Sequence, residues 1–289
     1  MDTWHIYNKG DNVLFRDNAD RIFFNNKFAA VCHTNSVEAL ALCELSTHFH
    51  SIACIGEEYQ VKAVTNDLKV SYGLYYRHKY GATLGNNFKI KCDRLIGRNI
   101  IIDKLVYVMT NPVHHYITES PYTWQFSSAN YIFTQEYLPP NFRKAIADST
   151  TALGNITIRK QREMLGRDIL PDSWMADPDG FILPNSFINV PKVRTYFNSS
   201  YRQFRYLVDT SVKDARQKNI NANKQAVFCD GLDDDKVCAI IDQFAVSCGH
   251  QSFHFLTEKE LMQIVSKLLS RGVPFEQYRR CLWLPKGDE

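Results

Sequence analysis

Short apolar runs that suit strands alternate with helix-like patterns in the first third of the chain. Residues 3–8 alternate apolar and polar positions and are rich in β-forming side chains, which predicts a strand. Residues 38–45 and 48–55 are two apolar runs joined by a short link. A link of this length favours an antiparallel hairpin between the two strands.

Two amphipathic helices and a fourth strand complete this pattern. Apolar positions recur at helical spacing in residues 17–33, with Asp17 or Asn18 as the N-cap, and in residues 57–80, which end at Gly81. Residues 87–92 predict the fourth strand. The order is that of a ferredoxin-like split βαββαβ unit in the α+β class, in which helices cover one sheet face and leave the other free.

The pattern changes after this unit. Residues 100–109 predict a helix that carries Tyr107, and Pro112 is expected to end or kink it near Asn111 because proline disfavours helical angles in the preceding residue. Residues 121–128 predict a loop. The run Leu138-Pro139-Pro140 suggests a boundary between a domain of residues 1–138 and a mainly helical accessory region of residues 139–289.

The accessory region should be built from helices. Residues 196–218 predict one helix, and residues 233–248, 257–270 and 275–282 predict three more, the second opened by a capping box of Thr257 and Glu260. Helices near residues 233–283 are candidates for DNA binding, because two short helices joined through Gly272 can form a helix-turn-helix. The alternative is a helical subdomain that only packs.

Composition describes a globular protein with a modest positive charge. The chain has 289 residues, 45% of them hydrophobic, and a formal net charge of +3 that permits nucleic-acid binding without arguing for it. No apolar run is long enough for a signal peptide or a membrane span, so we expect a cytoplasmic protein that does not contact a membrane. Oligomeric state stays open between monomer and homodimer.

The cysteines argue against a structural zinc site. They form no Cys-x-x-Cys pair and lie mostly within apolar segments, as reduced core cysteines do. They are Cys32, Cys43, Cys54, Cys92, Cys229, Cys238, Cys248 and Cys281.

Cations and aromatic residues are interleaved between residues 60 and 100. This combination suits single-stranded DNA, which needs cations for its phosphates and aromatic faces for its unstacked bases. An equally good interpretation is a solvated helix face whose tyrosines lie in the core. The candidate DNA-binding cations are Lys62, Lys69, Arg77, Lys79, Lys89, Lys91, Arg94 and Arg98. The aromatic residues are Tyr72, Tyr75, Tyr76, Tyr80 and Phe88.

His48 and His50 form the first candidate metal half-site. Residues two apart on a strand point to the same face, so the two imidazoles would stand side by side. With an oxygen ligand they suit Mg²⁺ or Mn²⁺ bound together with water and a substrate phosphate. A strand histidine that is merely hydrogen-bonded is the commoner case for either residue.

Tyr107 and Asn111 are four apart and share one face of a helix. Asn111 could supply the oxygen ligand. Tyr107 could act as a nucleophile once a metal withdraws charge from the attacked phosphate, although its reference pKa is about 10. Taken alone, Tyr107 is better explained as a core aromatic and Asn111 as a helix C-cap. His5 is expected to stabilise its strand or to contact a base.

Together, these segments resemble the single-tyrosine HUH transposases, and most closely the REP-associated tyrosine transposase branch. The opening segment Trp4-His5-Ile6-Tyr7-Asn8-Lys9-Gly10, the His48-Phe49-His50 motif and Tyr107 with Asn111-Pro112 follow in the family's order. Pro121-Tyr122 with Trp124 and Ser127-Ser128 matches the closing segment. The resemblance covers about residues 3–133.

The resemblance implies cleavage and rejoining of single-stranded DNA. His48, His50 and Asn111 would hold Mg²⁺ or Mn²⁺, and Tyr107 would attack the strand to form a 5′-phosphotyrosine link and a free 3′-hydroxyl. The expected partner is single-stranded or hairpin-forming DNA. Storage of the phosphodiester energy in the link would allow rejoining without ATP.

Two other classes of function remain open. Ser46-Thr47 stands where the family usually has Pro-Asn before the paired histidines, which favours a catalytically silent, domesticated protein that recognises structured DNA. The other alternative is a regulator whose C-terminal helices contact duplex phosphates through Arg271, Arg279 and Arg280.

Overall fold

The N-terminal strands form one antiparallel sheet in the order β2-β3-β1-β4. The structure is a computed structural model that describes residues 1–221 and 232–286. The strands are β1 Asp2–Asn8, β2 Glu38–Glu44, β3 Phe49–Ile55 and β4 Ile90–Leu95. The predicted α+β class and the β2-β3 hairpin are confirmed, whereas the fourth strand lies three residues later than predicted.

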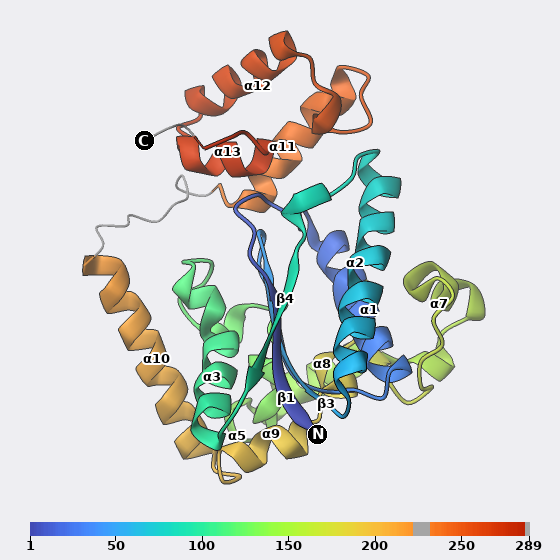
Figure 1. The fold of residues 1–289 in the computed structure, drawn as a ribbon, viewed down its shortest axis with the longest axis vertical. Helices are drawn as coiled ribbons and strands as arrows, with labels where there is room; N and C mark the ends of the chain where they lie inside the picture. Colours follow the sequence, from blue (N-terminus) through green and yellow to red (C-terminus); the bar gives the residue numbers. More distant parts are fainter. Residues whose placement is uncertain (222–231, 287–289) are drawn as a thin grey trace.

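Helices α1 and α2 cover one face of this sheet (Figure 1). Helix α1, Asn18–Thr34, begins at its predicted N-cap, because the Asp17 side chain accepts a hydrogen bond from the backbone N of Asp20. Helix α2, Glu58–Tyr80, ends at Gly81, whose φ of 71° gives the left-handed cap. Phe24 of α1 contacts Phe49 of β3 with ring centroids 4.5 Å apart, so helix and sheet share one aromatic core.

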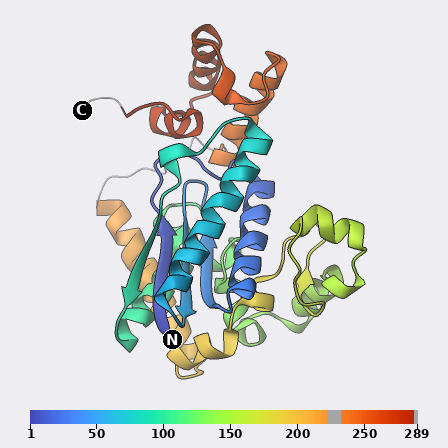
Figure 2. The ribbon, with the colours of Figure 1, turned by 45° about the vertical axis from the view of Figure 1, so that its right-hand side comes forward.

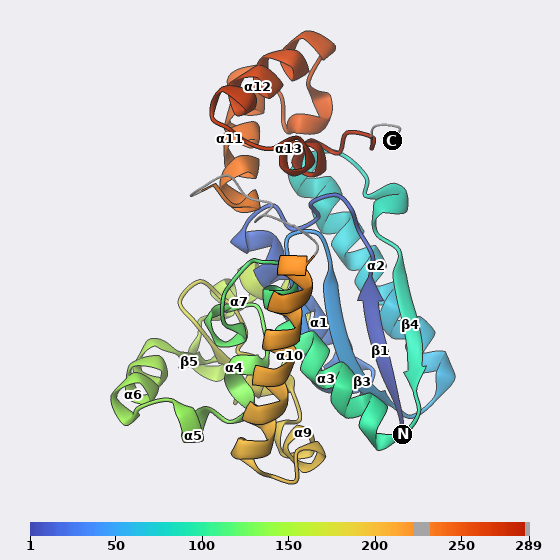
Figure 3. The same ribbon diagram turned by 90° about the vertical axis from the view of Figure 1, so that its left-hand side faces the viewer.

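Helix α3, Arg98–His114, packs on the opposite face, and α10, Tyr201–Asn221, lies along it (Figures 1 and 3). Of the two predicted effects of Pro112 near Asn111, an end or a kink, the end was wrong, because α3 continues to His114. Tertiary contacts outweigh the local preference here. Pro112 is buried, and Thr110 bonds to Ser211 of α10 at 2.9 Å between hydroxyl oxygens.

Short elements connect α3 to α10. The helices are α4 Ala129–Ile132, α5 Thr134–Tyr137, α6 Pro140–Ser149, α7 Ile158–Leu165, α8 Pro184–Phe187 and α9 Val190–Tyr196. A small sheet joins β5, Thr151–Ala152, to β6, Met175–Ala176. The predicted helix of residues 196–218 divides between α9 and α10, because Asn198 and Ser199 adopt positive φ angles between them.

The segment after the predicted boundary contributes to the first core. Ile188, Val193, Phe197 and Phe204 belong to the same buried cluster as the sheet and its helices. Ile188 also forms a parallel bridge to Ala39 of β2. The predicted boundary after Leu138 therefore stays a prediction, and chain on both sides of it packs together.

Three C-terminal helices sit at one end of the sheet (Figures 1 and 2). They are α11 Asp234–Ser247, α12 Glu258–Ser270 and α13 Phe275–Leu282, close to the predicted bounds. The capping box of Thr257 and Glu260 opens α12 as predicted. Cys229 lies outside the described residues. Among the described residues, no helix has the length and apolar character that a membrane span requires.

Candidate functional site

Strand β3 places His50 on the sheet face that α3 covers. His50 stands opposite Tyr7 of β1 and Cys43 of β2. His48 directly precedes β3, and its ring lies 5.1 Å from the His50 ring at 83°. The two imidazoles therefore lie together on one side of the sheet, and both are buried.

Helix α3 brings Tyr107 to the same place. The Tyr107 ring lies 5.2 Å from the His50 ring, at 77°. The phenol is half-buried rather than enclosed in hydrocarbon. Burial raises its pKa, and the nearby Asn111 carboxamide opposes this rise. The ammonium of Lys104, three residues earlier, lies 5.1 Å from the centre of the Tyr107 ring.

Both histidines use their Nδ1 atoms within the protein. His50 Nδ1 lies 2.9 Å from His5 Nε2, and His48 Nδ1 lies 2.8 Å from the Thr47 hydroxyl. Contacts of this kind fix the ring orientation and the tautomer, and they leave Nε2 as the remaining nitrogen for a metal. His5 thus supports His50, in agreement with the structural alternative considered for it.

The opening segment holds the turn that carries His48. Asn8 accepts a hydrogen bond from the backbone N of Phe49 through its side chain. A Cβ atom at Gly10 would lie 2.5 Å from the backbone oxygen of Thr47, so only glycine fits there. Ser46 donates to Asp234 of α11, which ties the same turn to the C-terminal helices. The Ser46-Thr47 departure is accommodated by these contacts.

Asn111 is a completely buried carboxamide. Within the described residues, neither its nitrogen nor its oxygen makes a hydrogen bond of standard geometry. It nevertheless lies within reach of His48 and of Tyr107, and its contact with His48 partly opposes the lowering of the His48 pKa by burial. A buried polar group without a partner costs about 1–3 kcal/mol, so it needs an explanation such as an ion or a ligand.

The imidazoles are neutral near physiological pH. Burial, followed by the neighbouring His115 ring, lowers the pKa of His48 to about 3. Burial, followed by the His48 and His5 rings, lowers the pKa of His50 to about 2. Neutral imidazole is the form that binds metals. Two neutral nitrogens beside a buried carboxamide therefore fit a divalent cation chemically.

The protein offers few metal-ligating side chains at this site. In the described part of the chain, no group of three or more His, Cys, Asp and Glu side chains is arranged to hold a metal ion. Any cation bound at His48 and His50 would depend on the Asn111 carboxamide, water and substrate for its remaining ligands.

The predicted DNA-binding cations do not form one surface. Lys62, Lys69, Arg77 and Lys79 lie on α2, on the sheet face opposite Tyr107 (Figure 1). Only Lys91 of β4 stands beside the site, opposite Tyr7 in the strand register.

Three of these cations have partners within the protein. Lys79 pairs with Asp17 and Asp20. Arg94 pairs with Asp2 at 2.7 Å, and Arg98 donates to the backbone oxygens of Thr195 and Tyr196. Lys89, just before β4, is exposed.

The predicted role of the aromatic residues in stacking bases was wrong for most of them. Tyr72, Tyr76, Tyr80 and Phe88 are buried, and Tyr75 stacks on Phe23 with ring centroids 4.0 Å apart. Helical spacing already placed these tyrosines on the apolar side of α2, which is the signal that favoured the core interpretation.

The C-terminal arginines proposed for duplex phosphates are largely engaged. Arg279 is buried and pairs with Glu276, and Arg280 pairs with Asp234 at 2.7 Å. The three helices enclose their own hydrophobic cluster, which agrees with a packing subdomain.

Sequence reasoning missed Thr47 and Lys104. Lys104 precedes Tyr107 by three residues, and this helical spacing was the available signal. Thr47 was noted only as a departure from the family, and its contact with His48 depends on the folded turn.

Comparisons with known proteins return one distant similarity. No protein-family model matches the chain, and no curated protein is significantly similar to it. Among solved structures, the chain is similar to a REP-associated tyrosine transposase bound to a REP hairpin, with 16% sequence identity and a TM-score of 0.36. The aligned region covers 48% of this chain and 82% of that one.

Proposed function

We propose that this protein is a metal-dependent transesterase that cuts and rejoins single-stranded DNA, on hairpin-forming substrates, through a 5′-phosphotyrosine intermediate. One observation carries the proposal. His48, His50 and Tyr107, from two distant segments, meet at one sheet face, and the buried Asn111 carboxamide lies within reach of both His48 and Tyr107 there, without a hydrogen bond of standard geometry among the described residues.

The arrangement of the sheet is part of this proposal. The element order β1-α1-β2-β3-α2-β4 and the strand order β2-β3-β1-β4 are observed, and we assign them to the ferredoxin-like split unit. In this assignment α1 and α2 cover one face, and the catalytic side chains occupy the other. The cations of α2 would then lie on the sheet face away from the bound DNA strand. Lys91 and Lys104 would contact the DNA phosphates instead.

His48, His50 and Asn111 are proposed to hold Mg²⁺ or Mn²⁺ through the imidazole Nε2 atoms and the carboxamide oxygen. When bound, the cation would neutralise phosphate oxygens and help the 3′-oxygen to leave. His5 and Thr47 would keep the rings oriented for this task.

Tyr107 is the proposed nucleophile. Its phenolic oxygen would form the bond to phosphorus while the bond from phosphorus to the 3′-oxygen breaks, and the phenol proton would leave to water at this half-buried position. A 3′-hydroxyl can later attack the phosphotyrosine bond, which restores the phenol and rejoins a strand without an external energy source.

Covalent capture of labelled hairpin DNA tests the proposal. With Mn²⁺ present, wild-type protein is expected to form a denaturation-resistant adduct, and Tyr107→Phe should reduce its yield at least about a hundredfold. Tyr206→Phe, which changes an exposed tyrosine on α10, is the matched control and should leave the yield unchanged. An equal adduct from Tyr107→Phe would remove Tyr107 from this role.

The second candidate is a catalytically silent protein that recognises structured DNA. It is favoured by the small donor set, because the described residues offer no third imidazole or carboxylate arranged for the cation. Hairpin affinity that persists in chelator, together with no adduct at any Mn²⁺ concentration, would decide for this alternative.

A further inference from the structure

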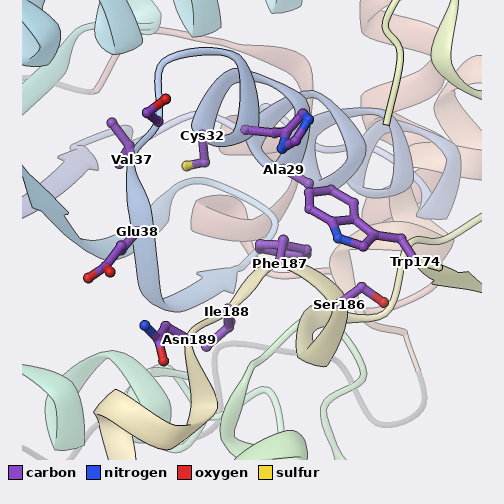
Figure 4. A pocket seen from close by; sticks show the side chains of 11 residues that line it. Ala29, Cys32, Val37, Glu38, Trp174, Ser186, Phe187, Ile188 and Asn189 are labelled. Carbon is purple, nitrogen blue, oxygen red and sulfur yellow. The ribbon is translucent and has the colours of Figure 1, made fainter. Parts of the chain in front are cut away.

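A second site candidate lies at the other end of strand β2. A cavity of about 450 Å³ opens between the end of α1, the start of β2 and the segment that includes α8 (Figure 4). Pockets for small ligands have volumes of about 300–1,000 Å³, so one planar group and its attached sugar would fit.

Aromatic rings form one wall of this cavity. The Trp174 ring lies 5.5 Å from the His33 ring and 6.2 Å from the Phe187 ring. Trp174 and Phe187 are only half-buried, although both line the cavity. Figure 4 shows these side chains grouped on the same side. An aromatic wall of this kind suits a flat ligand, because ring faces stack favourably.

A hydrogen-bond donor and an acceptor lie together at the β2 end. Asn189 is held beside β2 because its backbone N donates to the backbone oxygen of Ala39. Its Oδ1 caps α9 by accepting from the backbone N of Lys192, and its Nδ2 has no partner among the described residues. Glu38 Oε2 accepts from Lys192 Nζ, which leaves Oε1 as a free acceptor within the described chain.

We propose that this cavity binds one unpaired nucleobase, with a preference for purines. A base offers a flat face for stacking on Trp174, with the Phe187 ring tilted by 45° beside it, and each base edge carries a donor next to an acceptor, which complements Glu38 Oε1 and Asn189 Nδ2. A purine presents the larger face for stacking. Among the described residues that line the cavity none is a lysine or arginine, and the nearby Lys192 ammonium is paired with Glu38, which favours recognition of the base over the phosphate.

The cavity is separate from the proposed cation site. Cys43 of β2 stands opposite His50, and Glu38 lies five residues earlier, about 17 Å away along a strand. Nucleobase binding can therefore be measured without metal and without cleavage.

Calorimetry on the full chain in chelator tests the proposal with deoxynucleoside monophosphates as probes. Wild-type protein should bind dGMP or dAMP more tightly than dCMP or dTMP. Asn189→Asp keeps an oxygen for the α9 cap but removes the amide donor, and should weaken purine binding about tenfold. Trp174→Leu removes the stacking face and should weaken it at least as much. Tyr206→Leu, an exposed aromatic residue elsewhere, is the matched control.

Short thymidine strands with a central purine or a central abasic residue identify the source of the base. If the strand with a central purine binds more tightly than the purine monophosphate, the cavity is assigned to an unpaired base in DNA. If the monophosphate binds more tightly than the strand, the cavity is assigned to a free nucleotide. The proposal is overturned if no purine probe binds, or if Asn189→Asp and Trp174→Leu bind like wild type. Tyr107→Phe should retain full nucleotide affinity, so failure of the cleavage proposal leaves this result intact.

Discussion

At the scale of single residues, the candidate site is defined by what each polar atom contacts. His5 and Thr47 occupy the Nδ1 atoms of His50 and His48, and thereby assign Nε2 to any ligand. Asn111 differs because neither of its polar side-chain atoms makes a hydrogen bond of standard geometry in the described chain, although the side chain lies close to His48 and Tyr107. A buried amide placed in this way is available to a ligand.

Asn111→Leu is expected to stabilise the metal-free protein. The leucine keeps the branched shape of the side chain, removes a buried amide that makes no hydrogen bond of standard geometry and is a better helix former, so the free energy of unfolding should rise by about 1 kcal/mol. Urea unfolding in chelator measures this change. The same variant should lose Mn²⁺ binding.

The matched control is Asn26→Leu. Asn26 donates to the backbone oxygen of Gly180 and accepts from the backbone N of Ile182, so its loss should destabilise the protein. If Asn111→Leu destabilises as much as Asn26→Leu, then the Asn111 carboxamide has a structural role instead.

At the scale of elements, one buried carboxylate joins the two helices that cover the sheet. Asp20 of α1 accepts from Tyr75, Tyr80 and Lys79 of α2, and from the backbone N of Arg16. Burial, together with the neighbouring Asp17, raises the pKa of Asp20. The charge is tolerated because four donors surround it.

Asp20→Asn should destabilise the protein by about 3 kcal/mol, because it removes the buried negative charge beside Lys79 and replaces one acceptor oxygen by an amide donor that faces other donors. Asp17→Asn is the control, since it changes an exposed carboxylate that also contacts Lys79 and since asparagine caps helices well. Its effect should stay within about 1 kcal/mol. Equal effects in urea unfolding would contradict the role given to Asp20.

At the scale of the whole molecule, a buried arginine docks the C-terminal helices onto the sheet domain. The Arg16 guanidinium is fully buried, pairs with Asp242 of α11 and lies 3.9 Å from the Phe253 ring. Beside it, His254 Nε2 lies 2.9 Å from the Tyr76 hydroxyl of α2. The C-terminal segment therefore makes specific polar contacts with Arg16, which precedes α1, and with Tyr76 near the end of α2.

His254 makes this docking sensitive to acid. Burial, followed by Arg16, lowers the pKa of His254 from 6.5 to about 4. As the pH falls below 6.5, the unfolded chain takes up the proton first, so stability is lost between pH 6.5 and about 4. Between pH 7 and 5, wild type should lose about 1 kcal/mol more than His254→Asn, after allowance for partial exposure.

Urea unfolding of both proteins at the two pH values measures this difference. Carboxylates such as Glu44 contribute equally to both proteins, so their effect cancels in the comparison. Burial raises the pKa of Glu44, and this carboxyl therefore changes stability with pH in the direction opposite to His254. Parallel pH dependence in wild type and His254→Asn would show that His254 does not carry the effect.

Local sequence signals predicted the ends of helices correctly where the cap is formed by residues next to the helix. The Asp17 cap, the left-handed Gly81 and the capping box of Thr257 and Glu260 act within one turn of chain, so neighbouring residues suffice to define them. Prediction failed where distant contacts compete with local preference. Pro112 is tolerated inside α3 because the sheet and α10 hold that helix in place.

The sequence by itself determined the strands, the main helices and the pairing of His48 with His50 on one face, because periodicity and spacing are properties of the chain. Only the tertiary structure decided that α3 delivers Tyr107 to His50, that the Asn111 carboxamide is buried beside His48, and that the α2 cations lie on the other face of the sheet. Contacts between distant segments depend on how the whole chain packs, and the local spacing of residues does not determine that packing.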